Sequence, residues 1–246
     1  GFYIWRYSFY GRESAVRGFG LQENRRGHRI SGRNFIPGRM QKNKRLVGSD
    51  IGGREMIQKF EFEKTAIEGL IKVTPFNADD IRGCMTKDYS KEIFEANGIH
   101  HDLAEVFYTT SHKGVIRALH FQRVMQQPKL VRCICGHVFD VAVDLRKDSP
   151  TFMQWMGFDL IGEKHNEILI PAGCAHGYLV LEDSIVSYKC SEKFYGEYDD
   201  GIMWNDPEID VDWPLEKVGG IENVILADKD KNLQTFREFM DTYGGF

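Results

Sequence analysis

The sequence lacks several features that mark common protein classes. Among its 246 residues, no apolar run approaches the roughly 18 residues that a membrane-spanning helix needs, so we expect no membrane partner. Five cysteines occur, an odd number, and none forms a Cys-x-x-Cys pair, which argues against a disulfide framework. We therefore expect reduced, buried thiols and a cytoplasmic location.

Motifs for several kinds of catalysis are also absent. No Gly-x-Ser-x-Gly segment occurs, which excludes a serine hydrolase of that type, and no cysteine is flanked by activating groups. Glycine-rich phosphate loops of the dinucleotide and nucleoside-triphosphate kinds are missing. The His-x-His spacing is missing too. His120 and His176 with a carboxylate could still hold a metal ion, but we expect none.

Positive charge is scarce in most of the chain but abundant at its beginning. The net charge of −4 gives no reason to expect nucleic acid as a partner. Residues 1–55 hold 12 lysines and arginines against 4 acidic residues, and the remainder holds 20 against 32. This leader shows no hydrophobic period, whereas a well-patterned strand begins just after Met56. We expect residues 1–55 to be a non-native or disordered leader and residues 56–246 to form a single domain that begins at Met56.

Turn signals about every ten residues divide the rest of the chain into short strands, which is typical of a β sandwich or barrel. We therefore expect a mainly β fold with a few short helices. The expected strands are Lys59–Phe62, Ala66–Pro75, Glu105–Thr110, Val115–Gln122, Leu130–Cys135, His137–Leu145, Phe152–Leu160, Glu167–Pro171, Tyr178–Leu181 and Ile185–Ser191. Two turns are expected to reverse the chain, at Gly136 and at Glu182–Ser184. Helices are expected at Ser90–Asn97 and Lys231–Tyr243, and a polar turn at Asn77–Gly83.

The segment Gly114–Gln122 places a histidine, His120, inside an apolar strand. Because side chains alternate along a strand, His120 and Ala118 should share one face, and Arg117 should lie on the other. A histidine in such a strand is costly unless it is hydrogen-bonded or used chemically. Taken alone, a hydrogen-bonded core histidine is the more common case.

Further polar residues recur where strands would prefer apolar ones, and together they indicate acid–base chemistry. A histidine can remove a proton beside a carbonyl, a lysine can stabilise the enolate, and a tyrosine can return a proton from the other side. A core tyrosine or a surface lysine is more common for either residue alone, so only the combination supports this interpretation. The residues concerned are Arg117, His120, Lys129, Asp144, His176, Tyr188 and Tyr195.

All of these residues except Tyr195 lie within ordered sequence blocks of a stretch that runs from about residue 60 to about residue 232. They are Asp80–Gly83, Gly114–Gln122, Lys129–Cys133, Gly136–Arg146, Ser149–Phe152, Pro171–Tyr178, Tyr188–Lys189, Trp204–Pro207, Trp213–Pro214 and Ile225–Asp230. With these blocks, the chain resembles the dTDP-4-dehydrorhamnose 3,5-epimerase family of sugar-nucleotide epimerases. The resemblance implies a cupin, or jelly-roll, β-sandwich barrel.

The resemblance also implies a role for each residue. His120 would be the general base, oriented by Asp230, and Tyr188 would be the acid on the opposite face of the sugar. Lys129 would stabilise the enolate. The substrate-binding residues would be Arg82, Arg117, Gln122, His176, Tyr195 and Asp200, with the two arginines on the diphosphate.

The resemblance further implies the substrate and the assembly. The substrate would be a nucleotide-linked 4-keto-6-deoxy sugar, in rhamnose-type biosynthesis. No cofactor or metal would be needed, because the ketone itself acidifies the neighbouring carbons. The family works as a homodimer with exchanged N-terminal strands, so Arg82 would serve the partner's site.

Several positions depart from the family pattern. Ala118 replaces the usual glycine before Leu-His, and its methyl group is expected to narrow the pocket. Cys84–Lys87 replaces two aromatic residues and an acid. Glu105 and Phe107 replace the usual glutamine and asparagine, and Asp200 stands where a glutamate is usual. These changes leave dTDP, CDP, GDP and UDP sugars open, as well as inversion at carbon 3, carbon 5 or both.

Two alternatives have different chemistry. A 3,4-ketoisomerase of the same fold would arrange its base and acid on one face of the sugar. A non-catalytic cupin that binds a sugar nucleotide should have lost His120, Tyr188 or Asp230, and all three are present. The sequence therefore favours an epimerase.

Overall fold

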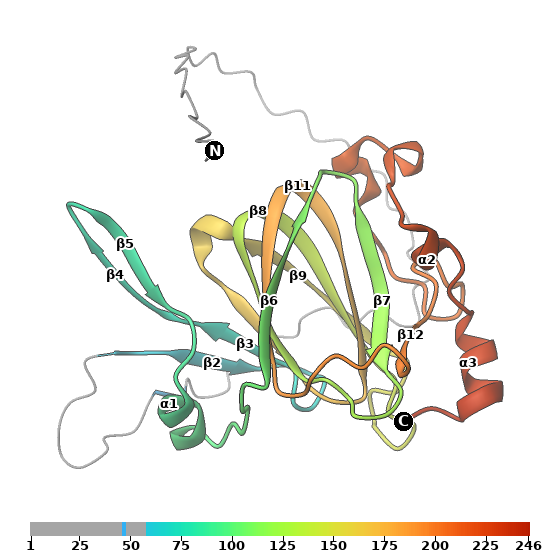
Figure 1. The fold of residues 1–246 in the computed structure, drawn as a ribbon, viewed down its shortest axis with the longest axis horizontal. Helices are drawn as coiled ribbons and strands as arrows, with labels where there is room; N and C mark the ends of the chain where they lie inside the picture. Colours follow the sequence, from blue (N-terminus) through green and yellow to red (C-terminus); the bar gives the residue numbers. More distant parts are fainter. Residues whose placement is uncertain (1–45, 48–57) are drawn as a thin grey trace, which may run out of the picture. The chain divides into compact units, whose positions relative to one another are not determined.

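The computed structural model describes residues 46–47 and 58–246. Apart from residues 46–47, the leader expected at residues 1–55 lies outside the described residues, and so does its expected boundary at Met56. The strands are β1 Leu46–Val47, β2 Glu61–Lys64, β3 Ile71–Thr74, β4 Phe76–Asp80, β5 Gly83–Lys87, β6 Glu105–Ser111, β7 Ile116–Gln122, β8 Lys129–Asp144, β9 Trp155–Ile161, β10 Glu167–Ile170, β11 Cys174–Cys190 and β12 Asp199–Gly201. The α-helices are α1 Lys91–Ala96, α2 Asp228–Lys231 and α3 Phe236–Tyr243. The main sheet follows the order β1-β2-β3-β10-β8-β11-β7-β12, with β6 paired to β11 and β9 to β8 (Figure 1).

Strands β8 and β11 form one long antiparallel ribbon with a bend near its middle. Their register runs from Cys174 opposite Asp144 to Cys190 opposite Lys129, with irregularities around Glu182. At the bend, Gly136 has a φ of +85°, and a Cβ atom there would stand 2.2 Å from the Asp183 carbonyl oxygen. Residues other than glycine rarely adopt this φ, and a side chain here would collide with the carbonyl oxygen. The expected chain reversals at Gly136 and Glu182–Ser184 are therefore wrong, because each strand continues through the bend.

This bend folds the ribbon into two facing layers. His176 and Tyr188 are twelve residues apart on β11, which would separate them by about 40 Å in a straight strand. Their ring centroids lie only 6.0 Å apart. Strand β7 pairs with the first half of β11 and β6 with the second half, so β6 and β7 belong to opposite layers. The expected mainly β sandwich with a few short helices is confirmed.

Other expected elements are found with shifted bounds. The helix expected from Ser90 is α1, and Gly98 follows it with a φ of +73°. The expected C-terminal helix begins later, at Phe236, because Thr235 and Glu238 form a capping box there. The polar turn expected at Asn77–Gly83 is instead the hairpin β4–β5, which extends away from the main sheet in Figure 1.

Large apolar side chains stabilise the side of the sandwich that carries β7. Trp155, Trp204 and Trp213 are buried there with Phe239 of α3. The indole N–H of Trp213 donates a hydrogen bond to the Trp204 carbonyl oxygen at 2.8 Å. This packing fixes the C-terminal segment against the sandwich, which matters because that segment also carries Asp230.

The cysteines are all free, but not all are buried. Cys133, Cys174 and Cys190 are buried, whereas Cys84 and Cys135 are exposed, so the expectation of buried thiols is wrong for two of them. Cys133 lies opposite Val186 and Cys135 opposite Ile185, which marks an irregularity in the β8–β11 register. Two steps along β8 thus match one step along β11, and this irregularity turns the two cysteines to different environments.

Within residues 46–47 and 58–246, no helix is both long and apolar enough to cross a membrane.

Candidate active site

A cavity of about 330 Å³ opens between the two layers of the sandwich. Residues from both layers line it, together with the segment around α2. The lining residues are Phe107, Thr109, Arg117, His120, Phe121, Gln122, Gln127, Lys129, His176, Tyr178, Tyr188, Phe194, Asp199, Ala227, Lys229 and Asp230. The structure therefore brings together seven of the ten predicted site residues.

Strand β7 presents both Arg117 and His120 to this cavity, although a regular strand would point them to opposite faces. His120 lies opposite His176 on β11, and Arg117 lies opposite Tyr178. Three steps along β7 thus match two steps along β11, which is the signature of a β-bulge. The expected separation of the two side chains is wrong because the bulge restores them to one side.

His120 and Asp230 form a close pair at one wall of the cavity. The Nε2 atom of His120 lies 2.8 Å from Oδ1 of Asp230, whose side chain is only 6% exposed. The other ring nitrogen, Nδ1, is buried and has no hydrogen-bond partner among the described residues. With Asp230 accepting from Nε2–H, the neutral ring carries its free lone pair on Nδ1. A histidine paired with a carboxylate in this way, at the wall of a cavity, is suited to act as a base.

A second histidine–carboxylate pair lies beside the first. Nε2 of His176 is 2.8 Å from Oδ2 of Asp140, and both side chains are buried. Burial lowers the pKa of His176, and burial raises the pKa of Asp140. Since His176 lies opposite His120 across the strand pair, a neutral His176 adds no positive charge beside His120.

Tyr188 reaches the cavity from the layer that faces His120. Its side chain is buried, and its ring and the His176 ring form an edge-type contact with an interplanar angle of 74°. Burial raises the pKa of Tyr188 well above its usual value, and the neighbouring Tyr178 adds to the effect. The hydroxyl group therefore stays protonated at neutral pH and can act as a proton donor.

Lys129, at the start of β8, adds an amine to the cavity. Burial lowers the pKa of Lys129, which the nearby carboxylates of Asp140 and Asp199 partly offset. Lys229 pairs with Asp199, and both of these residues also line the cavity. Three cationic side chains, Arg117, Lys129 and Lys229, thus line a single cavity, an arrangement suited to an anionic ligand.

Three predicted site residues do not line the cavity. Arg82 lies on the hairpin β4–β5, where its side chain is 85% exposed and paired with Asp80. Tyr195 packs on the Tyr198 ring, and its backbone N–H donates to Gln122. The third is Asp200, whose neighbour Asp199 lines the cavity instead.

Asp199, and not Asp200, is the acidic residue of β12 at the cavity. Asp200 accepts hydrogen bonds from the side chain of Gln234 and pairs with Arg123. Adjacent residues on a strand point to opposite faces, so only one of the two can face the cavity.

Ala118 does not narrow the cavity, contrary to expectation. It is fully buried and is not among the lining residues. A Cβ atom on Gly177 would stand 2.4 Å from the Ala118 methyl group, so this methyl packs against the backbone of the neighbouring strand.

Several lining residues were not predicted as site residues. Phe107, Tyr178, Asp199 and Lys229 have no distinctive spacing in the sequence, although Lys229 directly precedes Asp230. Asp140 could have been found, because a carboxylate in the apolar strand that precedes Asp144 needs a partner.

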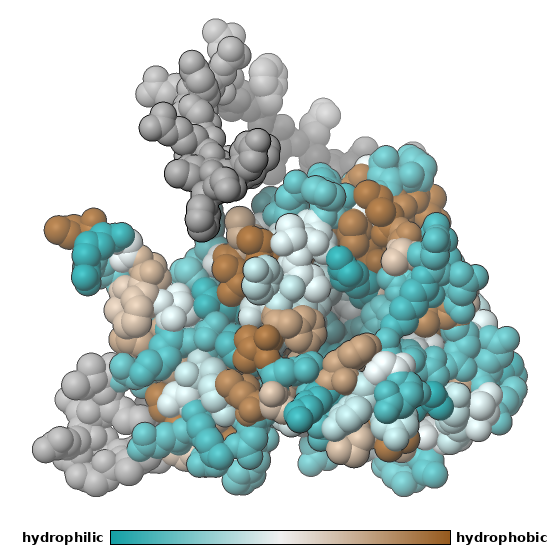
Figure 2. Space-filling view, in the orientation of Figure 1, coloured by the Kyte–Doolittle hydropathy of each residue, from teal (hydrophilic) through white to brown (hydrophobic). Residues whose placement is uncertain are grey.

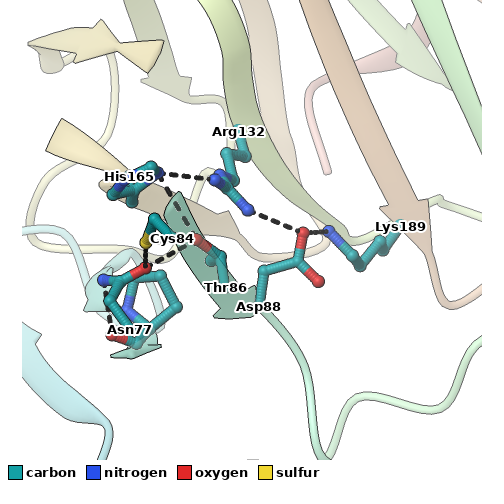
Figure 3. A network of polar contacts seen from close by, with 8 residues as sticks. Asn77, Cys84, Thr86, Asp88, Arg132, His165 and Lys189 are labelled. Carbon is teal, nitrogen blue, oxygen red and sulfur yellow. Dashed lines mark hydrogen bonds and ion pairs between the residues drawn. The ribbon is translucent and has the colours of Figure 1, made fainter. Parts of the chain in front are cut away.

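A separate polar network ties the hairpin β4–β5 to the layer that carries Tyr188 (Figure 3). Asp88, just after β5, accepts from Arg132 of β8 at 3.2 Å and from Lys189 of β11 at 2.7 Å. Arg132 also donates to Nδ1 of His165 at 2.8 Å. Burial raises the pKa of the adjacent Glu167 well above its usual value. Asp88 is the carboxylate that pairs with both buried cations.

Replacing Asp88 with asparagine is expected to lower the free energy of unfolding by about 3 kcal/mol, because two buried cations lose their counter-charge. Urea denaturation at neutral pH measures this change. Asp102→Asn is the matched control, since Asp102 pairs with Lys91 on the exposed surface and should leave the urea midpoint unchanged. Equal midpoints for the two variants would contradict the assigned role of Asp88.

The chain matches proteins of known activity along most of the described region. A profile described as dTDP-4-dehydrorhamnose 3,5-epimerase matches residues 64–238. The chain is 45% identical over 181 residues to the dTDP-4-dehydrorhamnose 3,5-epimerase of Methanothermobacter thermautotrophicus, covering 73% of this chain and 96% of that protein.

Solved structures agree with this match. A dTDP-6-deoxy-D-glucose-3,5-epimerase from Legionella pneumophila, in complex with dTDP-4-keto-L-rhamnose, superposes with a TM-score of 0.68 at 36% identity. The match covers 72% of this chain and 93% of that one. A 3'-monoepimerase from Streptomyces bikiniensis, in complex with dTDP-quinovose, has a TM-score of 0.66 at 29% identity and covers 72% and 88%. These likenesses confirm the expected cupin-type, jelly-roll fold.

Proposed function

The chain belongs to the dTDP-4-dehydrorhamnose 3,5-epimerase family, and from this premise we propose that it inverts carbon 3, carbon 5 or both of a nucleotide-linked 4-keto-6-deoxy sugar in deoxysugar biosynthesis. It is an isomerase of the epimerase type. The observation that carries the proposal is the His120–Asp230 pair on one side of a cavity that Tyr188 enters from the facing layer.

His120 is the general base. Its imidazole ring removes the proton from the carbon next to the 4-keto group, and the electron pair moves to the ketone oxygen as an enolate. Asp230 fixes the ring through the 2.8 Å contact at Nε2 and stabilises the imidazolium that forms. The substrate's own ketone acidifies the carbon, so the proton transfer needs no cofactor.

Tyr188 is the acid. It donates its phenolic proton to the carbon from the side opposite His120, which inverts the stereocentre. The two-layer geometry supports this assignment. His120 lies on β7 in one layer, whereas Tyr188 lies on the second half of β11, which belongs to the other layer. The high pKa of Tyr188 keeps the proton available until the enolate forms.

Several of the remaining lining residues bind the substrate. Lys129 stabilises the enolate oxygen, and its buried position strengthens that interaction. Arg117 and Lys229 hold the diphosphate as separate positive charges. Gln122 and His176 contact the sugar. The predicted contributions of Tyr195 and Asp200 are indirect in this arrangement, since Tyr195 supports Gln122 and Asp200 lies behind Asp199.

We assign dTDP as the nucleotide, because relatives with this sugar nucleotide in their names or complexes match nearly their full length. Wild-type protein incubated with dTDP-, UDP-, CDP- and GDP-4-keto-6-deoxyglucose tests the assignment, with the product configuration read from proton coupling constants. Fastest epimerisation of the dTDP sugar supports it, and faster conversion of another nucleotide sugar overturns the nucleotide only. Migration of the carbonyl to carbon 3 would identify a ketoisomerase. Unchanged substrate in every case would identify a binding protein.

We also propose a homodimer that exchanges its N-terminal strands. The hairpin β4–β5 exposes Ile81 completely and Met85 by half, and its tip is an apolar spot in Figure 2. An exposed apolar tip beside a charged Arg82 suits insertion next to a second copy. The five free cysteines fit a reducing compartment, and we extend the proposal to the cytoplasm.

Mixing two inactive variants tests whether Arg82 serves the partner subunit's site. Arg82→Ala and His120→Asn are each expected to be inactive alone. After joint unfolding and refolding, random pairing should restore about a quarter of the wild-type activity, because each mixed dimer contains one intact site. No recovery in a mixture that has reassembled into dimers would place Arg82 at its own chain's site.

A further inference from the structure

Phe107 is an aromatic side chain that lines the cavity without a role in the proposed chemistry. It lies on β6 directly opposite Tyr188 of β11. The two rings stack with centroids 4.7 Å apart and planes only 13° from parallel. Phe107 remains 40% exposed, whereas Tyr188 is 7% exposed. The Phe107 ring therefore covers one face of the Tyr188 ring.

Two neighbouring rings hold the Tyr188 ring, and the Tyr178 side chain interacts with its hydroxyl group. Phe107 lies flat on one face of its ring, and the His176 ring meets it at 74° with a centroid separation of 6.0 Å. The Nε2 atom of His176 lies 2.8 Å from Oδ2 of Asp140, and this hydrogen bond fixes the position of the His176 ring. Phe107 is more exposed than His176. It lies on β6, and among the described strands β6 pairs only with β11.

We infer that Phe107 is a positioning residue that holds the Tyr188 hydroxyl at the face of the sugar opposite His120. This inference rests on the proposed function, in which Tyr188 is the acid. Without the stacked ring, Tyr188 would still be present but would sample more orientations. Proton abstraction by His120 would be unaffected, because His120 lies on β7 in the other layer and is fixed by Asp230.

The effect of Phe107 should therefore appear in how the enolate is partitioned. In deuterated water, the enolate receives a proton either from Tyr188, which inverts the carbon, or back from the His120 side, which keeps the configuration. Return after exchange of the histidine proton with solvent leaves deuterium in substrate that is not inverted. A poorly placed Tyr188 slows inversion and raises the proportion of deuterium in recovered substrate.

Phe107→Leu removes the ring but keeps an apolar side chain, and it is the test variant. We expect the rate of net inversion to fall about tenfold, because the Tyr188 ring loses its stacking partner and one of its faces is no longer covered. The ratio of deuterium in recovered substrate to epimerised product should rise by a similar factor. Phe107→Tyr keeps the ring and should restore the wild-type ratio. Tyr108→Leu is the matched control, because Tyr108 is 72% exposed on the same strand and does not line the cavity.

The double variant Phe107→Leu/Tyr188→Phe shows whether Phe107 acts through Tyr188. We expect it to show the same deuterium ratio as Tyr188→Phe alone, because the positioned group is already gone. An equal loss of exchange and inversion in Phe107→Leu, or an additional change in the double variant, would overturn the inference. If Phe107→Leu unfolds, Phe107→Met answers the same question. Absence of exchange in the wild-type protein would instead overturn the proposed function.

Discussion

Replacing His120 with asparagine is expected to lower turnover about a thousandfold and to stop deuterium exchange at both carbons beside the ketone. Asparagine occupies similar space but cannot accept a proton from carbon. The enolate then never forms, so neither return nor inversion can follow. Proton NMR of the substrate in deuterated water measures exchange and turnover in one experiment.

His112→Asn is the control for this variant. His112 is 84% exposed, and its ring contacts only Asp183, at 3.5 Å, among the described ion pairs. It should keep wild-type rates of exchange and turnover. If His120→Asn retained more than about a tenth of the wild-type exchange rate, another group would be the base, since a general base ordinarily contributes a hundredfold or more.

Replacing Tyr188 with phenylalanine is expected to give a different defect. Net inversion should fall about a hundredfold to a thousandfold, because the facing layer no longer supplies a proton. Exchange should continue, because His120 can still remove a proton and return a deuteron to its own side. The ring that stacks on Phe107 is kept, so the variant removes only the hydroxyl group.

Tyr198→Phe serves as the control for the lost hydroxyl group. Tyr198 packs on Tyr195 outside the cavity and should retain full inversion. Full inversion by Tyr188→Phe would show that a different group, such as a water molecule, acts as the acid. Loss of exchange together with inversion would show that Tyr188 is needed before the enolate forms.

The mainly β fold could be predicted because short apolar strands and frequent turn residues are local signals. The wrong predictions arise where local signals and long-range pairing disagree. Gly136 carries a turn-like signal, but pairing with β11 keeps the strand continuous, and the glycine permits a bend where the Asp183 carbonyl oxygen comes close. Nothing in the sequence near Gly136 reveals which partner strand will approach it.

Within the candidate site, His120 could be singled out because a histidine is costly in an apolar strand. His120, Tyr188 and Asp230 do meet at one cavity, as the resemblance implied. Strict alternation wrongly separated Arg117 from His120, because the bulge depends on the register with β11. The choice between Asp199 and Asp200 fails for a similar reason, since only the pairing of β12 with β7 decides which carboxylate faces inward.

The positions of deuterium in the product of the wild-type protein test the central claim most directly. The protein is incubated in deuterated water with dTDP-4-keto-6-deoxyglucose, and each carbon of the epimerised product is examined by NMR. A base and an acid in facing layers predict that every inverted carbon carries a solvent deuteron. Inversion with retention of the original hydrogen would contradict proton removal by His120 and its replacement by Tyr188.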